Sequence, residues 1–261
     1  MTLKTIDLKV ADYLTPKPFT IETTDSLSNA IDLMADKGIG NLVVEKNENV
    51  KGILTERDIL EHLVSKKKLE GTQMIGVPLS TFTVVSPETS VIDAARLMIV
   101  RKTRLLVCDD KKMIGIITAT DMVRAFRRTS SNPQLDKVIS TTLYTVKDAD
   151  DIFKAVKIMH DKKIGSIIVT KHKEPYGIFT ERDLLVNVLS YDADLKNPVV
   201  GYCSQPLITA EYGVKGSDAA KIMAENKIKR LILTKQGKVS AIVTARDIVD
   251  AFQSSFSGED L

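Results

Sequence analysis

One nine-residue pattern recurs four times in this chain and constrains its fold more than any other feature. Each copy is an apolar run that ends in Thr, followed by two further residues, an Asp and a second apolar stretch. The copies are Gly52–Leu60, Gly115–Val123, Gly177–Leu185 and Ala241–Val249. Their Thr residues lie 63, 62 and 64 positions apart (118 − 55, 180 − 118 and 244 − 180). A period of this length predicts a protein built from four similar repeats.

Each copy predicts a strand that turns directly into a helix. The run before Thr is rich in β-branched residues, as in a buried strand. Thr is a good helix N-cap, and an acidic residue in the first turn interacts favourably with the helix dipole. Backbone N–H groups at a helix start lack intrahelical partners, so such a corner is a candidate site for an anion or a sugar. The same pattern is also that of a plain helix cap, and this alternative stays open.

The remainder of each repeat predicts the order β-α-β-β-α. In the first repeat we expect strands at 19–21, 41–45 and 50–54 and helices starting at 27 and 59. In the second repeat we expect a helix at 91–100 and strands at 104–108 and 113–117. The join between the first helix and the next strand is one residue shorter there than in the first repeat, so we expect a tighter turn.

Length and composition limit the class of protein. The 261 residues suit one large or two ordinary domains, and a repeat of about 60 residues buries too little surface to be stable alone, so the repeats must pair. Apolar residues make up 43% and charged residues 27%, which is typical of a soluble globular protein. A net charge of +3 is too weak by itself to indicate binding to nucleic acid or to a membrane.

Cysteine usage and the absence of a targeting pattern favour a cytoplasmic protein. Cys108 and Cys203 are the only cysteines and lack metal-ligand spacing, so we expect reduced, buried thiols. Residues 1–10 lack the apolar core of a signal peptide, and no run approaches the ~20 apolar residues of a membrane span. The three histidines are scattered over different elements, so we expect no metal site.

The repeats alternate in character along the chain. Copies one and three share Thr-Glu-Arg-Asp, whereas copies two and four share Thr-Ala-x-Asp and a basic residue before the middle strand. The duplicated ancestor was therefore a pair of repeats, with its boundary in the polar stretch 127–133. We predict a first module at 1–128, with repeats at 7–66 and 74–128, and a second at 129–261, with repeats at 134–192 and 198–256.

Four such repeats, each ending in Gly-h-h-Thr-x-x-Asp-h-h (h, apolar), resemble CBS domains over nearly the whole chain. The resemblance implies an α/β (α+β) fold in which two CBS repeats pack through their sheets as a pseudo-twofold Bateman module, so this chain would hold two modules. The arrangement is similar to the four-repeat regulatory subunits of AMP-activated kinases. It also implies binding of an adenosine compound: AMP, ADP or ATP, and less often S-adenosylmethionine or a dinucleotide such as NAD.

The residue types of the motif suit a nucleotide. A carboxylate can accept both hydroxyls of a ribose diol, and a Thr hydroxyl at a helix start suits phosphate. Arg is the best cation for phosphate because its guanidinium can grip two oxygens. The ribose candidates are Asp58, Asp121, Asp183 and Asp247, and the hydroxyl candidates are Thr55, Thr118, Thr180 and Thr244. The cation candidates are Arg57, Arg182 and Arg246 within the motif, and Arg104 and Arg230 before a middle strand.

The resemblance implies how these residues combine. In the family, the Asp of one repeat shares a cleft with the basic residue before the middle strand of its partner repeat. One cleft would hold Thr55, Asp58 and Arg104, and another Thr180, Asp183 and Arg230. The clefts of Asp121 and Asp247 would face Asn41 or Ser166 and lack that basic residue, so they rank lower for phosphate. Backbone groups near Thr83 and Ile208 would read the adenine edge.

We therefore expect a free-standing regulatory protein, not an enzyme, that binds AMP before ATP, because no P-loop and no clear Mg²⁺ carboxylate cluster accompanies the motifs. The expected partners are an adenine nucleotide and a further, unidentified protein, with neither nucleic acid nor membrane among them. Self-association as a homodimer is left open. The alternatives are a ligand-free interaction scaffold, a nucleotide hydrolase and a nucleic-acid-binding protein. Arg57 and Arg182 can instead pair with Glu56, Glu181 or another acid.

Overall fold

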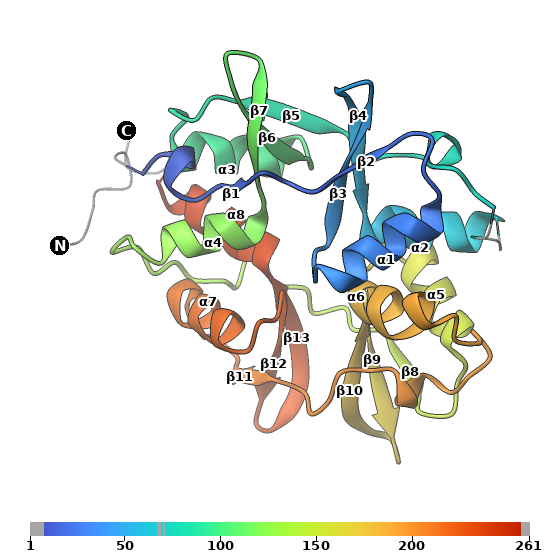
Figure 1. The fold of residues 1–261 in the computed structure, drawn as a ribbon. Coiled ribbons are helices and arrows are strands. Elements are labelled where there is room, and N and C mark those ends of the chain that lie inside the picture. Colours follow the sequence, from blue (N-terminus) through green and yellow to red (C-terminus); the bar gives the residue numbers. More distant parts are fainter. Residues whose placement is uncertain (1–7, 67–68, 70, 257–261) are drawn as a thin grey trace. The chain divides into compact units, whose positions relative to one another are not determined.

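The computed structural model describes residues 8–66, 69 and 71–256, which form two compact units (Figure 1). Of the described residues, unit 1 takes 8–18, 82–143 and 208–256, and unit 2 takes those within Phe19–Thr81 together with Tyr144–Leu207. Unit 1 therefore contains the second and fourth repeats, and unit 2 contains the first and third.

The two repeats of unit 2 have the predicted order of elements. The first repeat consists of β2 (Thr20–Glu22), α1 (Leu27–Asp36), β3 (Asn41–Lys46), β4 (Asn49–Thr55) and α2 (Glu56–Lys66), followed by the 3-10 helix η3 (Met74–Gly76). The third consists of β8 (Thr145–Lys147), α5 (Ile152–Asp161), β9 (Ser166–Lys171), β10 (Glu174–Thr180), α6 (Glu181–Asp183), η4 (Leu184–Val188) and η5 (Leu189–Tyr191), followed by η6 (Val199–Gly201).

The two repeats of unit 1 have the same order. A short segment with η2 (Val10–Asp12) and β1 (Thr15–Pro16) comes first. The second repeat consists of β5 (Phe82–Val85), α3 (Val91–Val100), β6 (Arg104–Asp109), β7 (Lys112–Ile117) and α4 (Ala119–Phe126). The fourth consists of β11 (Thr209–Glu211), α7 (Gly216–Glu225), β12 (Arg230–Lys235), β13 (Lys238–Thr244) and α8 (Ala245–Phe256).

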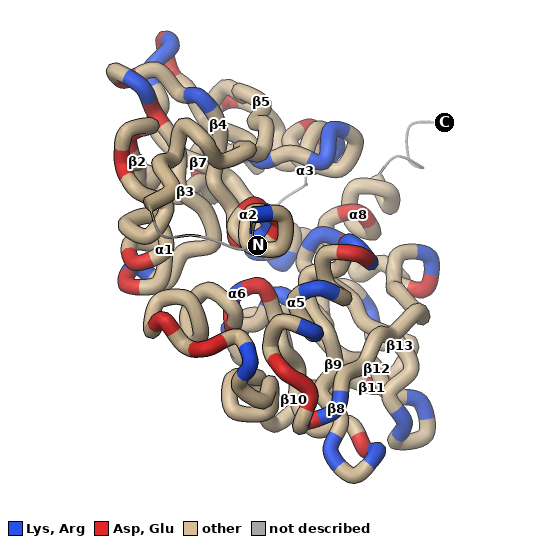
Figure 2. Tube along the Cα trace, turned by 90° about the vertical axis from the view of Figure 1, so that its right-hand side faces the viewer, with Lys and Arg blue, Asp and Glu red and all other residues tan. Residues whose placement is uncertain are grey.

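Each repeat builds one small sheet. The first strand lies parallel to the middle strand, and the middle strand pairs antiparallel with the third, as in the order β2-β3-β4. In the β3–β4 turn, Asn47 and Glu48 both have positive φ, which matches the tight turns that suit twisted hairpins. The hairpin ends carry charged residues, which keeps these turns in water (Figure 2). The segment β1 adds a fourth strand beside β7.

The first helices of the first and second repeats begin at the serine caps that their sequences predict. The Ser26 hydroxyl accepts a hydrogen bond from the backbone N–H of Asn29 and caps α1, and Ser90 caps α3 in the same way. Three residues separate α3 from β6, against four between α1 and β3. The predicted tighter turn in the second repeat is therefore confirmed. Lys102 takes a positive φ there, as Gly38 does after α1.

The two repeats of each unit share their hydrophobic interior. In unit 1, buried side chains of α3 and α4 form one cluster with those of α7 and α8, and the rings of Phe126 and Phe252 stack with centroids 4.9 Å apart. In unit 2, Leu60 and Leu63 of the first repeat join the core of the third. Leu185 of the third repeat joins the core of the first. This exchange explains how repeats too small to fold alone become stable.

The predicted fold class, mixed α and β with four β-α-β-β-α repeats, is confirmed. One closing helix differs from the regular form: in the third repeat, α6 passes into a π-helix at Leu184–Val188 and then into the 3-10 helix η5. No helix among the described residues is both long enough and apolar enough to cross a membrane. The modules at 1–128 and 129–261 stay a prediction.

Candidate ligand site at the strand-to-helix corners

The four Thr and Asp pairs close on each other at the start of a helix. In each corner the backbone N–H of Thr donates to Oδ2 of the Asp three residues later. These distances are 2.8 Å for Thr55, 2.9 Å for Thr118, 2.8 Å for Thr180 and 2.8 Å for Thr244. The alternative of a helix cap is thus present at every corner, and it occupies Oδ2. A ligand at a corner must therefore bind through the hydrogen-bond acceptor capacity of the carboxylate that the cap does not use, mainly that of Oδ1.

A segment from outside the motif crosses the last strand of each repeat. Ser80 forms an antiparallel bridge with Ile53, and both hydrogen bonds of the bridge measure 3.0 Å. We call these bridge-forming stretches the crossing segments. The bridged pairs are Thr15 with Ile116, Ser80 with Ile53, Ser140 with Ile242 and Ser204 with Ile178. A Cβ at Gly52 would lie 2.7 Å from Cβ of Leu79, so the motif Gly gives the crossing segment room.

Three crossing segments donate a hydroxyl hydrogen bond to the corner carboxylate. Ser80 Oγ lies 2.9 Å from Oδ1 of Asp58, and Ser204 Oγ lies 2.8 Å from Oδ1 of Asp183. The Thr15 hydroxyl is a further donor to Asp121, whose Oδ1 also accepts from Arg124 Nη2 at 3.3 Å. These hydroxyls were missed from the sequence. Their recurrence at Thr15, Ser80, Ser140 and Ser204, at intervals of 65, 60 and 64 residues (80 − 15, 140 − 80 and 204 − 140), is the signal that could have revealed them.

The corners differ in how fully their carboxylates are occupied. Asp183 accepts hydrogen bonds from the backbone and hydroxyl of Thr180 on Oδ2, and from Ser204 and Asn187 on Oδ1. Asp247 accepts from the backbone and hydroxyl of Thr244, both on Oδ2. Ser140, which crosses there, donates to the carbonyl of Thr142 instead. Within the described part of the chain, Oδ1 of Asp247 therefore has no hydrogen-bond donor.

Burial perturbs the charged groups of the corners in unit 1. It raises the pKa of Asp121 and of Asp247 above the usual range for Asp, and the hydrogen bonds from Thr118 and Thr244 act against that shift. Burial also lowers the pKa of the neighbouring Arg246, and the positive charge of Arg104 lowers it further. The charges of Arg104 and Arg246, which come from different repeats of unit 1, therefore act on each other.

The motif arginines of unit 2 are engaged in ion pairs between its two repeats. Arg57 Nε bonds to Oε1 of Glu181, whose side chain is 9% exposed. Reciprocally, Arg182 Nη1 lies 3.8 Å from Oε1 of Glu56, and its Nη2 donates to the carbonyl of Gly38 at 2.8 Å. The alternative of pairing with Glu56 and Glu181 is thus present. These arginines join the first repeat to the third.

The corresponding positions in unit 1 have a different composition. Ala119 and Ala245 stand where unit 2 has its two glutamates, and Thr120 stands where it has Arg57. Arg246, the counterpart of Arg182, is half-buried and donates to the carbonyl of Met98 at the end of α3. The repeats of unit 1 therefore meet without the Arg–Glu pairs of unit 2, and Arg246 instead joins the fourth repeat to the end of α3.

The other predicted site residues lie on the first strands or at strand starts. Arg104 begins β6, Arg230 begins β12, Thr83 pairs with Leu105 in the β5–β6 register, and Ile208 precedes β11. All of them belong to unit 1, whereas Thr55, Asp58, Thr180 and Asp183 belong to unit 2. The clefts implied by the resemblance combine residues from both units, and these combinations stay a prediction.

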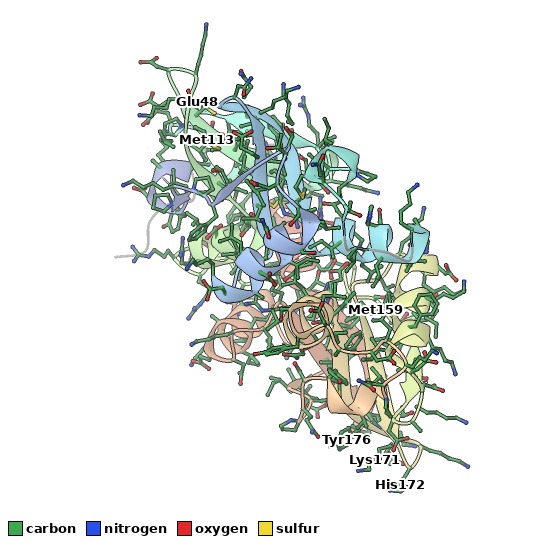
Figure 3. All side chains as sticks on the ribbon, turned by 45° about the vertical axis from the view of Figure 1, so that its right-hand side comes forward. Glu48, Met113, Met159, Lys171, His172 and Tyr176 are labelled. Carbon is green, nitrogen blue, oxygen red and sulfur yellow. The ribbon has the colours of Figure 1, made fainter. Side chains whose placement is uncertain are left out.

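The hairpin ends lie away from the corners. Figure 3 labels Lys171, His172 and Tyr176 at the end of the β9–β10 hairpin, where Lys171 Nζ lies 5.1 Å from the centre of the Tyr176 ring. The Thr180 corner is at the opposite end of β10. Among the residues that the structure describes, no group of three or more His, Cys, Asp and Glu side chains could hold a metal ion.

A comparison of the sequence with protein-family models supplies the family. The model of the CBS domain matches residues 10–65, 76–128, 135–190 and 199–254, which are the four repeats described above. This chain belongs to the CBS-domain family. The matched segments contain all four corners, so the Thr-x-x-Asp motif is part of the CBS domain itself and not an addition to it.

Proteins with a similar sequence occur in archaea. Protein MJ1404 of Methanocaldococcus jannaschii is 26% identical over 261 residues, covering 92% of this chain and 61% of that protein. A 33.4 kDa protein from a ribosomal RNA operon of Thermofilum pendens is 27% identical over 200 residues, covering 71% of this chain and 66% of that protein. The chain thus spans about two thirds or less of the length of these relatives.

A solved structure shares the four-repeat fold. It is that of protein MJ1225 from Methanocaldococcus jannaschii, described as a proposed archaeal homologue of g-AMPK. It matches with a TM-score of 0.77 and 18% identity, covering 94% of this chain and 100% of that one. At this identity the likeness establishes the fold of the CBS-domain chain.

Proposed function

We propose that this CBS-domain protein is regulatory and binds an adenine nucleotide, AMP before ADP or ATP, at its strand-to-helix corners. The observation that carries the proposal lies in unit 1. Arg246 at the fourth corner is half-buried, and its pKa is lowered by burial and by the nearby guanidinium of Arg104. The charge of Arg246 also acts on the neighbouring carboxylate of Asp247. A single ligand with a phosphate and a ribose diol would satisfy both kinds of group.

The phosphate part of the proposal follows from charge. Two guanidinium groups held close together repel each other, and an anion placed between them would offset that repulsion. A phosphate oxygen pair matches the geometry of a guanidinium better than that of an ammonium group. The start of α8 would add backbone N–H groups that favour an anion. The combination of Thr244, Arg246 and Arg104 therefore favours a phosphate.

The ribose part follows from the carboxylate. Asp247 keeps Oδ1 for further hydrogen bonds, and a carboxylate can only accept them, so its partner must be a donor such as a sugar hydroxyl. The clefts that pair Asp58 with Arg104 and Asp183 with Arg230 belong to the same proposal through the family resemblance. Every corner carboxylate holds its own helix start, a role that suits binding and not proton transfer. We therefore propose a binding protein, not an enzyme.

Regulation requires a second state or a partner. A ligand shifts an equilibrium only when it binds two arrangements with different affinity. We accordingly include a protein partner in the proposal, whose affinity for this chain would change with nucleotide. The alternative of an interaction scaffold draws support from Asp183, whose four hydrogen-bond donors give it a structural role without any ligand.

The test is isothermal titration calorimetry of the full chain with AMP, ADP, ATP, S-adenosylmethionine and NAD. We expect AMP to bind with a dissociation constant below about a millimolar. Arg246→Gln should weaken AMP binding about tenfold or more, because it removes a charge-assisted contact. Arg128→Gln, which removes an exposed charge outside the motif, is the matched control. No AMP binding, together with a melting temperature that no nucleotide raises, would favour the scaffold.

A further inference from the structure

The four corners hold the same carboxylate but differ in what occupies it. At Asp58, Asp121 and Asp183, a hydroxyl from the crossing segment donates to the acid. At Asp247 the equivalent residue, Ser140, bridges Ile242 through its backbone but turns its hydroxyl towards the carbonyl of Thr142, 3.4 Å away. Three corners are therefore closed by the chain itself, and one is open.

The closing hydroxyl has the chemistry of the proposed ligand. A ribose hydroxyl and a Ser hydroxyl both donate an O–H to a carboxylate oxygen. The helix cap uses Oδ2 in every corner, so a diol and a crossing hydroxyl would compete for the remaining capacity, mainly at Oδ1. At Asp183, both Ser204 and Asn187 already donate to Oδ1. A ligand there must displace existing hydrogen bonds before it gains its own.

We propose that the crossing hydroxyls of Thr15, Ser80 and Ser204 are built-in competitors for the ribose diol, so that the Asp247 corner fills first. This inference rests on the proposed nucleotide binding and adds an order of filling to it. This order of filling differs from the ranking in the sequence analysis. That ranking counted only the arginines available for phosphate and placed the corners of Asp58 and Asp183 first. The number of hydrogen bonds that a corner carboxylate already accepts, and not only the number of nearby arginines, decides which corner can bind a nucleotide first.

The competition also links ligand binding to the crossing segments. Ser204 is joined to β10 by two backbone hydrogen bonds with Ile178, of 3.0 and 2.9 Å, in addition to its hydroxyl contact. Ligand that displaces the hydroxyl removes one of the three attachments of this segment. Filling of the closed corners at higher nucleotide concentration would therefore loosen the stretch that leads into the next repeat, while filling of the open corner would leave its own bridge unchanged.

The experiment compares matched serine variants of the full chain by calorimetric titration with AMP and with 2′,3′-dideoxy-AMP, which lacks the diol. Ser204→Ala removes a competitor and should tighten one of the weaker AMP binding events about tenfold, the value of one charge-assisted hydrogen bond. Ser140→Ala removes a hydroxyl that does not touch an acid and should leave every event unchanged. Asp247→Asn, which keeps an acceptor for Thr244, should weaken the tightest event at least tenfold.

The outcomes separate the two proposals. AMP binding with a tightest event that depends on Asp247, and a gain in Ser204→Ala but not in Ser140→Ala, supports the order of filling. AMP binding that survives Asp247→Asn unchanged, or equal binding of the dideoxy nucleotide, overturns the order of filling and the ribose contact of Asp247, and leaves the proposed nucleotide binding itself standing. No binding of AMP to the wild type overturns both. Thermal melting of each variant confirms that it folds.

Discussion

Replacing Gly177 with Ala tests how closely the crossing segment approaches β10. The new Cβ would lie 2.8 Å from Sγ of Cys203 and 2.9 Å from the carbonyl oxygen of Ser204. The sulfur can rotate away, but the carbonyl belongs to a backbone bridged to Ile178 on the same strand. Either the strand or the crossing segment must shift by several tenths of an ångström.

The cost can be worked out from these contacts. An extra methyl group in a tightly packed place costs about 1–3 kcal/mol. Replacing Gly with Ala also removes freedom from the unfolded chain, which returns about 0.5 kcal/mol. We expect a net loss of about 1.5 kcal/mol in the free energy of unfolding, which lowers the melting temperature by about 3–6 °C for a protein of this size.

Differential scanning calorimetry and urea unfolding followed by circular dichroism measure this loss. Gly201→Ala is the control, because a Cβ there meets nothing within 4 Å and no positive φ opposes it. If Gly177→Ala proves as stable as Gly201→Ala, the close approach of the crossing segment, and with it the hydroxyl contact to Asp183, would be refuted.

Three further predictions concern the ion pairs, the buried acids and the core. Glu181→Ala should cost about 2–4 kcal/mol by urea unfolding, because it leaves Arg57 without its partner in a partly buried place, and adding Arg57→Ala should recover part of that loss. Glu225→Ala, which breaks an exposed pair with Lys221, should cost less than about 0.5 kcal/mol. Burial raises the pKa of Asp121, so the folded chain binds the proton of this carboxyl group more tightly than the unfolded chain does. The free energy of unfolding of the wild type should therefore fall relative to that of Asp121→Asn as the pH rises from about 4 to 7. A difference that does not change with pH would contradict this. Phe252→Ala should cost about 3–5 kcal/mol in thermal melts, since it empties a fully buried site against Phe126, and a smaller loss than for Phe256→Ala would contradict the packing.

The repeat period made the fold predictable. Four copies of a strand-to-helix corner fixed the order of elements, and the caps at Ser26 and Ser90 could be recognised from local sequence. The irregular closing helix of the third repeat could not be predicted, because Leu184–Val188 has the apolar spacing of an ordinary helix. There the side chain of Asn187 reaches Asp183 and the carbonyl of Tyr202, contacts that depend on the folded unit.

The sequence predicted the residue types of the candidate site but not the hydrogen-bond and ion-pair partners of those residues. The motif placed Thr and Asp side by side because three positions span one helical turn. The crossing hydroxyls lie outside the motif and reach it only through the fold, as Ser80 reaches Asp58 from 22 positions away. The pairing of Arg57 with Glu181 spans 124 positions, so the sequence could offer it only as one alternative among several.

The exchange of charges in unit 2 has a consequence for how this gene can change. Glu56 and Arg57 of the first repeat pair with Arg182 and Glu181 of the third. Each of these repeats therefore contributes one acid and one base, and only a repeat with the same two residues can complete both ion pairs. The repeats of unit 1 have Ala119 and Ala245 at the glutamate positions, so they could not form these ion pairs with a repeat of unit 2. Replacing the first repeat by a copy of the second would leave Glu181 and Arg182 without their partners. A substitution at Arg57 would be tolerated mainly when Glu181 changes as well.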